Sequence, residues 1–168
     1  MAEIPSTPAD GNVRVVFVPT IADPTAPTVT ELGAGTAVDL SCYITGGGLA
    51  ATVDEQSIAD ERLCSVQVFE QPGRSSNSLE LTYIDNTNSP NAATDNKAVD
   101  TLVRGTTGYV VIRRGIAYED AFAASQKVRV YPTEAGAYRP NAPEANSVLT
   151  ATTKMFVTGE VKDATVAI

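Results

Sequence analysis

The chain has 168 residues, a formal net charge of −8 at pH 7 and 43% hydrophobic residues. These values exclude a largely disordered chain and fit one folded domain over residues 1–168, because a domain of this length buries roughly 70% of its unfolded surface. The negative charge disfavours specific binding to nucleic-acid phosphates and anionic lipids. We expect no membrane insertion either, since the longest apolar runs fall far short of the roughly 20 residues of a membrane helix.

The absence of histidine excludes several large enzyme classes. Ser/His and Cys/His nucleophilic pairs and nearly all catalytic zinc sites need that side chain. Two cysteines, Cys42 and Cys64, cannot supply a structural zinc site by themselves. The sequence therefore predicts neither an enzymatic activity nor a bound cofactor or metal.

The amino-terminal part predicts an arm followed by strands. Residues 1–12 lack the basic and apolar segments of a secretory signal, so we expect synthesis in the cytosol. A strand is expected over residues 14–19, which end at Pro19. The segment 37–45 alternates between apolar and polar residues, as a half-buried strand does.

The two cysteines share this strand pattern. Cys42 lies on the apolar side of the segment 37–45, and Cys64 lies on the apolar side of a similar segment at 62–70. Two buried thiols are the favoured interpretation, because a reducing cytosol disfavours a disulfide. A disulfide and a reactive cysteine remain the alternatives.

Between these segments, residues 45–61 predict a long inter-strand loop. A loop of more than about 12 residues is usually functional or disordered, and the run Gly46, Gly47 and Gly48 gives this one conformational freedom. Its acidic residues lack the ligand spacing of an EF-hand and predict a solvated surface rather than a calcium site. These residues are Asp54, Glu55, Asp60 and Glu61.

One helix is expected, over residues 96–103, where apolar residues form a single stripe. Asp95 is its predicted N-cap, and Gly105 is positioned to end it. The preceding residues 85–96 predict a second long loop. The segment 119–126 is too short and too weakly periodic to assign.

Four further strands complete the predicted fold, at 77–84, 109–112, 127–131 and 147–161. The continuous apolar run at 109–112 is typical of a strand covered on both faces. The last strand is unusually long, and a long edge strand favours self-association. The fold class is therefore mainly β: an antiparallel β-sandwich or partly closed barrel with one flanking α-helix.

Three arginines at the two ends of the strand at 109–112 form the densest basic group of this acidic chain. Arg104 precedes the strand, and Arg113 and Arg114 follow it. Arginine binds carboxylates bidentately, so these residues are candidates for contacts with another copy of the chain. Pairing with a carboxylate of the same chain is the alternative.

The order of these segments resembles the tail tube (major tail) proteins of long-tailed, non-contractile bacteriophages, especially those of actinobacterial hosts. The resemblance covers essentially the whole chain. The family that it points to is related in fold to the tube proteins of type VI secretion. The resemblance rests on a series of segments: "NVRVVFVPTIADPTAPTVTEL", "AVDLSCYIT", "RLCSVQVFEQPGRSSNSLELTYI", "KAVDTLVRGTTGYVVIRRG" and the Thr-rich final strand.

The resemblance implies a structural virion protein that forms hexameric rings stacked into a hollow tail tube, through which DNA is ejected without specific binding. The implied partners are the chain itself and the tail-length and tail-terminator proteins. The loop at 45–61, with the arms at 1–12 and 159–168, would contact the adjoining ring. The candidates within that loop are Gly46, Gly47, Gly48, Asp54 and Glu55, and those for the lumen are Asp39 and Glu80.

A second interpretation comes from a different class of function. A monomeric β-sandwich could serve as a binding or adhesin module of a phage tail tip. That interpretation predicts a ligand pocket and a stable monomer, whereas the tube predicts self-assembly through exposed strand edges.

Overall fold

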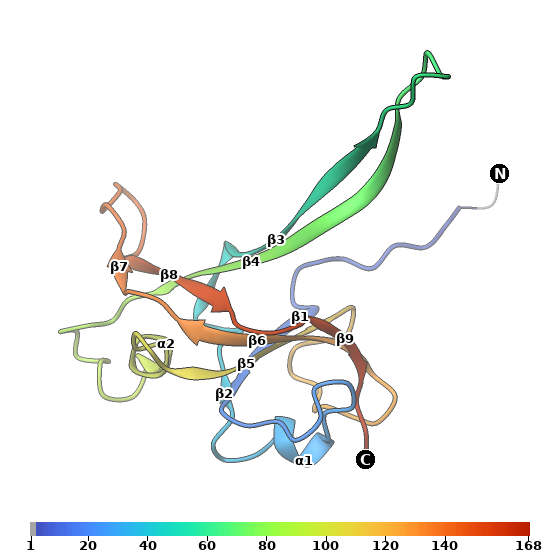
Figure 1. The fold of residues 1–168 in the computed structure, drawn as a ribbon. Coiled ribbons are helices and arrows are strands. Elements are labelled where there is room, and N and C mark those ends of the chain that lie inside the picture. The colour runs from blue at the N-terminus through green and yellow to red at the C-terminus, as the bar shows by residue number, and fades with distance from the viewer. Residues whose placement is uncertain (1–2) are drawn as a thin grey trace.

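The structure, a computed structural model, describes residues 3–168 and is dominated by one antiparallel sheet (Figure 1). Its strands are β1 (Val13–Val18), β2 (Val38–Asp39), β3 (Ile44–Asp60), β4 (Phe69–Ile84), β5 (Thr107–Arg114), β6 (Lys127–Ala135), β7 (Arg139–Pro140), β8 (Thr150–Val157) and β9 (Lys162–Thr165). Its helices are α1 (Val29–Leu32) and α2 (Lys97–Thr101).

The strands follow the order β2-β1-β5-β6-β8-β4-β3, with β7 paired to β8 and β9 paired to β6. The two ends of this path, β2 and β3, do not pair with each other within the described residues, so the sheet is curled and not closed into a barrel. The mainly β, antiparallel prediction is confirmed. The expectation of a single helix is wrong, because α1 and α2 are both present.

Apolar residues cover both faces of the central strands. In β1, Val15 and Phe17 belong to one core cluster, while Val16 and Val18 belong to a second cluster on the opposite face. The strand β5 divides in the same way, which confirms the prediction from its continuous apolar run. Central strands with both faces covered explain why one sheet supports two cores.

The first core cluster contains side chains from β1, β4, β5, β6, β8 and α2. It includes Leu79, Leu81 and Tyr83 from β4. The second cluster packs under α1 and the segment that contains Phe122.

The predicted helix at 96–103 is confirmed in place, as α2, but its cap is different. Asn96 occupies the N-cap position, and its side-chain oxygen accepts a hydrogen bond from the Asn86 backbone N–H (3.0 Å) rather than capping the helix. Asp95 therefore does not cap α2. The Asn96 amide instead fixes the loop at 85–96, which the structure confirms as a succession of turns and bends.

The helix α1 was not predicted, although its start carries a recognisable signal. Thr28 and Glu31 form a capping box: the Thr28 hydroxyl accepts a hydrogen bond from the Glu31 N–H, and the Glu31 carboxylate accepts one from the Thr28 N–H. Hydrogen bonds from the backbone N–H groups of Ala22 and Thr28 lower the pKa of Glu31. The same carboxylate thus fixes both the helix and the segment before it.

We expect Thr28→Ala to lower the free energy of unfolding by about 1 kcal/mol, because it removes the side chain that caps α1. Thermal unfolding followed by circular dichroism measures the change. Thr7→Ala, in the exposed amino-terminal segment, is the matched control and should leave the transition unchanged. Equal transitions for the two variants would contradict this account of the cap.

Four predicted elements differ in the structure. Residues 45–61 are not a loop, since β3 pairs with β4 along almost its whole length. The predicted strand at 37–45 is interrupted: β2 and the first two residues of β3 are strand, and between them the chain turns, with the Tyr43 and Ile44 N–H groups bonded to the Leu40 carbonyl.

The predicted strand at 62–70 is mostly the turn between β3 and β4, which leaves only Phe69 and Glu70 in a strand. Both cysteines are consequently exposed as free thiols, and the prediction that Cys42 and Cys64 are buried is wrong. The last predicted strand is shortened to β8, and residues 159–168 contain β9, which pairs with β6.

Candidate assembly surfaces

The most prominent surface feature is a long hairpin that leaves the body of the molecule (Figure 1). The strand β3 has 17 residues, which corresponds to about 55 Å at the usual rise of roughly 3.3 Å per residue. Only residues Leu79–Ile84 of β4 pair with β8. Beyond that point the two strands continue as an isolated ribbon, which we call the hairpin arm (residues 52–78).

Both edges of the hairpin arm lack a strand partner within the described residues. An isolated two-stranded ribbon is marginally stable in water, and free strand edges attract further strands. The arm therefore exposes two strand edges that are available for pairing.

Apolar side chains are exposed along the hairpin arm. Leu63 and Val66 at its tip are fully exposed, at 111% and 110% of their reference areas. Exposed apolar groups that cluster in this way mark interaction sites. The others on the arm are Val53, Ile58, Val68 and Phe69.

A groove of about 1030 Å³ opens where the arm leaves the body. Its floor continues the first core cluster and is apolar, formed by Val13, Val15, Ile44, Leu49, Ile112 and Tyr131. Its rim carries charged side chains from the amino-terminal segment and from β5, β6 and β9: Asp10, Arg114, Lys127, Arg129 and Asp163. We refer to this feature as the groove.

The charges on the rim differ in their partners. Arg129 binds Asp163 through two hydrogen bonds of 2.6 and 2.8 Å, and this contact raises the pKa of the arginine and lowers that of the carboxylate. Within residues 3–168, neither Arg114 nor Lys127 forms an ion pair. The described rim therefore has two cations without an ion pair, Arg114 and Lys127, and one such carboxylate, Asp10.

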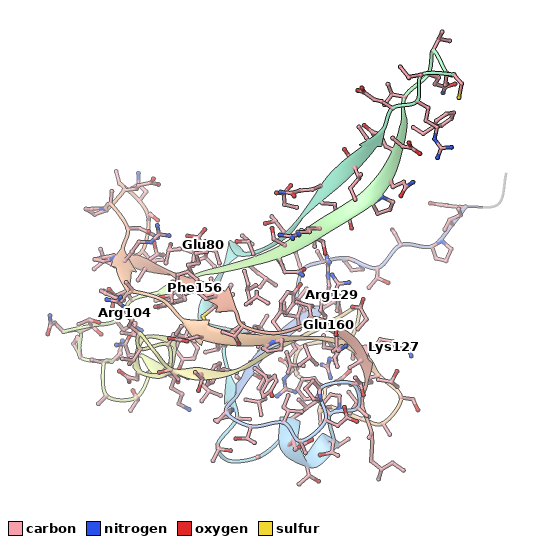
Figure 2. The ribbon with its side chains drawn as sticks, viewed as in Figure 1. Glu80, Arg104, Lys127, Arg129, Phe156 and Glu160 are labelled. Atoms are coloured by element: carbon pink, nitrogen blue, oxygen red, sulfur yellow. The ribbon has the colours of Figure 1, made fainter. Side chains whose placement is uncertain are left out.

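The three arginines predicted as inter-subunit contacts have different environments. Arg104 and Arg114 are exposed, and Figure 2 shows Arg104 at the opposite end of the body from Lys127. Arg113 is fully buried. Its guanidinium donates to the carbonyls of Ala117 (2.6 Å) and Ala121 (3.1 Å) and to the side chain of Gln126 (3.2 Å), all within its own chain.

Arg113 and Arg14 together hold the segment that precedes β6. Both guanidinium groups lie 5.0 Å from the centre of the Phe122 ring, and Arg14 also donates to the Asp120 carbonyl (2.8 Å). Burial and the neighbouring Arg14 charge lower the pKa of Arg113. This arginine is a structural clamp, and its side chain is not free for another subunit.

The two lumen candidates lie on the same face of the sheet. Asp39 is paired in register with Val16, which belongs to the second core cluster. Glu80 is opposite Lys154, whose side chain lies on that same face. Each candidate carboxylate is bound by an arginine of its own chain: Asp39 by Arg14 (2.9 Å), and Glu80 by Arg139.

The three glycines of the predicted ring-stacking loop have different roles in β3. A Cβ at Gly46 or Gly47 would meet no atom within 4 Å, whereas one at Gly48 would lie 2.1 Å from the backbone oxygen of Thr82. Gly48 permits the close approach at the irregularity between Ile44 and Leu49. The acidic candidates Asp54 and Glu55 are exposed on the hairpin arm.

Residues 3–168 show two absences that bear on other kinds of site. Over that part of the chain, no helix is long and apolar enough to cross a membrane. The same residues contain no group of three or more cysteine, aspartate or glutamate side chains arranged to hold a metal ion.

A model of the phage tail tube protein family matches residues 1–168. The chain belongs to the phage tail tube protein family. It is thus a structural component of the phage virion, and the family resemblance read from the sequence is confirmed at this level.

The fold of this tail tube protein is also found in a solved assembly. It is similar, with a TM-score of 0.51 and 17% identity over 93% of this chain and 95% of the other, to a chain in the cryo-EM structure of the anti-feeding prophage (AFP) baseplate, 6-fold symmetrised. No match was found among curated protein sequences.

The hairpin arm and the groove were not predicted from the sequence. On the arm, most residues of both faces are polar, so no strand period appears. The sequence signal that could have revealed the arm is the apolar pair Leu63 and Val66, which stands between acidic residues.

Proposed function

We propose that the chain polymerises as stacked hexameric rings into a tail tube that conducts DNA during ejection into the host. The observation that carries this proposal is the hairpin arm. It combines free strand edges with exposed apolar side chains in a member of a tail tube family. An arm of this kind gains stability when a second copy covers it.

The similarity to a chain of a baseplate determined with 6-fold symmetry supports the hexameric ring. In such a ring each subunit makes heterologous contacts that close by rotation. Arg104 and Arg114, both exposed, are the proposed contacts with carboxylates of neighbouring copies. We leave Arg113 out of this set because its hydrogen bonds lie within its own chain.

The face that carries Asp39 and Glu80 is the proposed wall of the channel. Both carboxylates are paired with arginines, and Lys154 lies beside Glu80 in register. Such a wall is closer to neutral than to strongly acidic. It binds DNA phosphates weakly, because its arginines are already paired with carboxylates. Few free cations are then left to replace the counterions of the DNA.

The finer assignments follow the sequence resemblance. We propose a tail of the long, non-contractile type, from a phage of an actinobacterial host, assembled in the host cytoplasm. Tail-length and tail-terminator proteins are the proposed partners that fix the length of the tube. Gly46, Gly47, Asp54 and Glu55 lie on the strand that builds the arm and are proposed to face the adjoining ring.

The double variant Leu63→Asp, Val66→Asp tests the role of the hairpin arm. We expect it to stay folded, since both residues are exposed, and to lose self-assembly at least tenfold, because two apolar anchors are replaced by charges. Sedimentation velocity and negative-stain microscopy measure the loss. Two exposed apolar residues of another loop supply the control, in the variant Val148→Asp, Leu149→Asp. Normal tubes from the arm variant would contradict the proposal.

A further inference from the structure

The groove and the tip of the hairpin arm have complementary chemistry. The groove has an apolar floor and two unpaired cations, Arg114 and Lys127, at its rim. The tip presents Leu63 and Val66 without any cover. An apolar floor and exposed apolar anchors fit one another when a partner excludes water between them.

The charges of the arm have the opposite sign to the free charges of the rim. Over residues 52–78 the hairpin arm has five carboxylates and two arginines, Arg62 and Arg74. Arg62 binds Asp60 (2.7 Å). Among the described residues Glu61 and Glu70 form no ion pair, so two free carboxylates flank the apolar tip as two free cations flank the groove.

The arm of one molecule does not fill its own groove. The groove lies where the arm leaves the body, and the arm leads away from that point to its tip (Figure 1). The groove is lined by β3 as far as Val53, and the seven residues from there to Asp60 lead about 23 Å further out at roughly 3.3 Å per residue. A tip can therefore enter a groove only between two molecules.

We propose that the groove of one copy receives the hairpin tip of a second copy, with Leu63 and Val66 on the apolar floor and Glu61 and Glu70 opposite Arg114 and Lys127. This inference rests on the proposed tube and names the receiving surface within it. A groove at the root of one arm that binds the tip of the next gives a head-to-tail contact, which repeats without limit along a stack. The charge pairs fix the register of the contact and make it sensitive to salt.

Crosslinking between copies tests this contact directly. In a Cys42→Ser background, the native Cys64 at the tip is exposed, and Asp10→Cys places a second thiol on the rim without removing either cation. A short bismaleimide should then produce a ladder of dimers and higher oligomers. Glu144→Cys, in an exposed loop away from the groove, is the matched control and should remain monomeric on the gel.

Charge reversal provides a second test. Arg114→Glu with Lys127→Glu should block assembly, as should Glu61→Lys with Glu70→Lys. A mixture of the two double variants should restore mixed oligomers, because each reversed groove meets a reversed tip. The restoration should weaken as salt is raised.

The outcomes separate this inference from the tube itself. Tubes without the ladder, or tubes from the groove variant alone, would overturn the tip-in-groove contact and leave the tube standing. A ladder without tubes would support the contact and count against the tube. The absence of both, with the other tail proteins supplied, would overturn the two proposals together.

Discussion

Arg113→Met is expected to lower the free energy of unfolding by about 3 kcal/mol, a large part of the roughly 5–15 kcal/mol of a typical domain. The side chain is fully buried in the protein. Its removal takes away the hydrogen bonds to Ala117, Ala121 and Gln126, and hydrogen bonds to a charged group contribute about 1.5–3 kcal/mol each. Methionine fills similar space without replacing the guanidinium.

Urea unfolding followed by circular dichroism measures this effect, since the chain has no tryptophan for fluorescence. The adjacent Arg114→Met is the matched control. Its side chain is exposed, so its stability should change by less than about 0.5 kcal/mol. Arg113→Lys should fall between the two, because an ammonium cannot bond three separated acceptors as the planar fork does. Equal midpoints for Arg113→Met and Arg114→Met would contradict the clamp.

Gly48→Ala is expected to destabilise the chain by about 2–3 kcal/mol or to prevent folding. The new Cβ would lie 2.1 Å from the Thr82 backbone oxygen and 2.6 Å from the Thr45 hydroxyl. Backbone cannot move aside as a flexible side chain can, so β3 and β4 must separate locally. This change falls at the base of the hairpin arm and should loosen its attachment.

Gly47→Ala is the matched control, because a Cβ there meets nothing within 4 Å. We expect it to leave stability unchanged within about 0.5 kcal/mol. Thermal unfolding of the two variants side by side gives the comparison. Similar melting temperatures would show that the close approach at Gly48 has no energetic weight.

The sequence pattern predicts the central part of the fold well. Strands such as β5 and the carboxyl half of β4 are buried, and burial imposes the apolar runs and alternations that periodicity detects. The helix α2 is found for the same reason, since Ala98 and Leu102 face the core. Where burial in a core constrains the choice of residues, the hydrophobic pattern predicts the element.

The hairpin arm shows why the sequence pattern does not predict the other parts of the fold. Its residues are exposed on both faces and carry no core pattern, so glycine and acidic residues at 45–61 predict a loop. The strand is specified instead by its long-range pairing with β4. We propose that self-assembly covers the arm. The hydrophobic periodicity of a single chain does not predict such contacts between copies.

The candidate site residues divide along a similar line. The arginine group at the ends of β5 is distinguished by its density in an acidic chain. Density alone does not distinguish the buried Arg113 from the exposed Arg114. The local carbonyls that bind Arg113 are backbone groups, which any sequence supplies. Spacing therefore could not separate the clamp from a contact residue.

The most direct test of the central claim is cryo-electron microscopy of assemblies formed by the purified chain at high concentration, with the other tail proteins added if needed. End-on views should show six subunits around an open channel, and side views should show stacked rings with the hairpin arm of each subunit seated on another copy. Isolated monomers under all these conditions, or closed particles without a channel, would contradict the account.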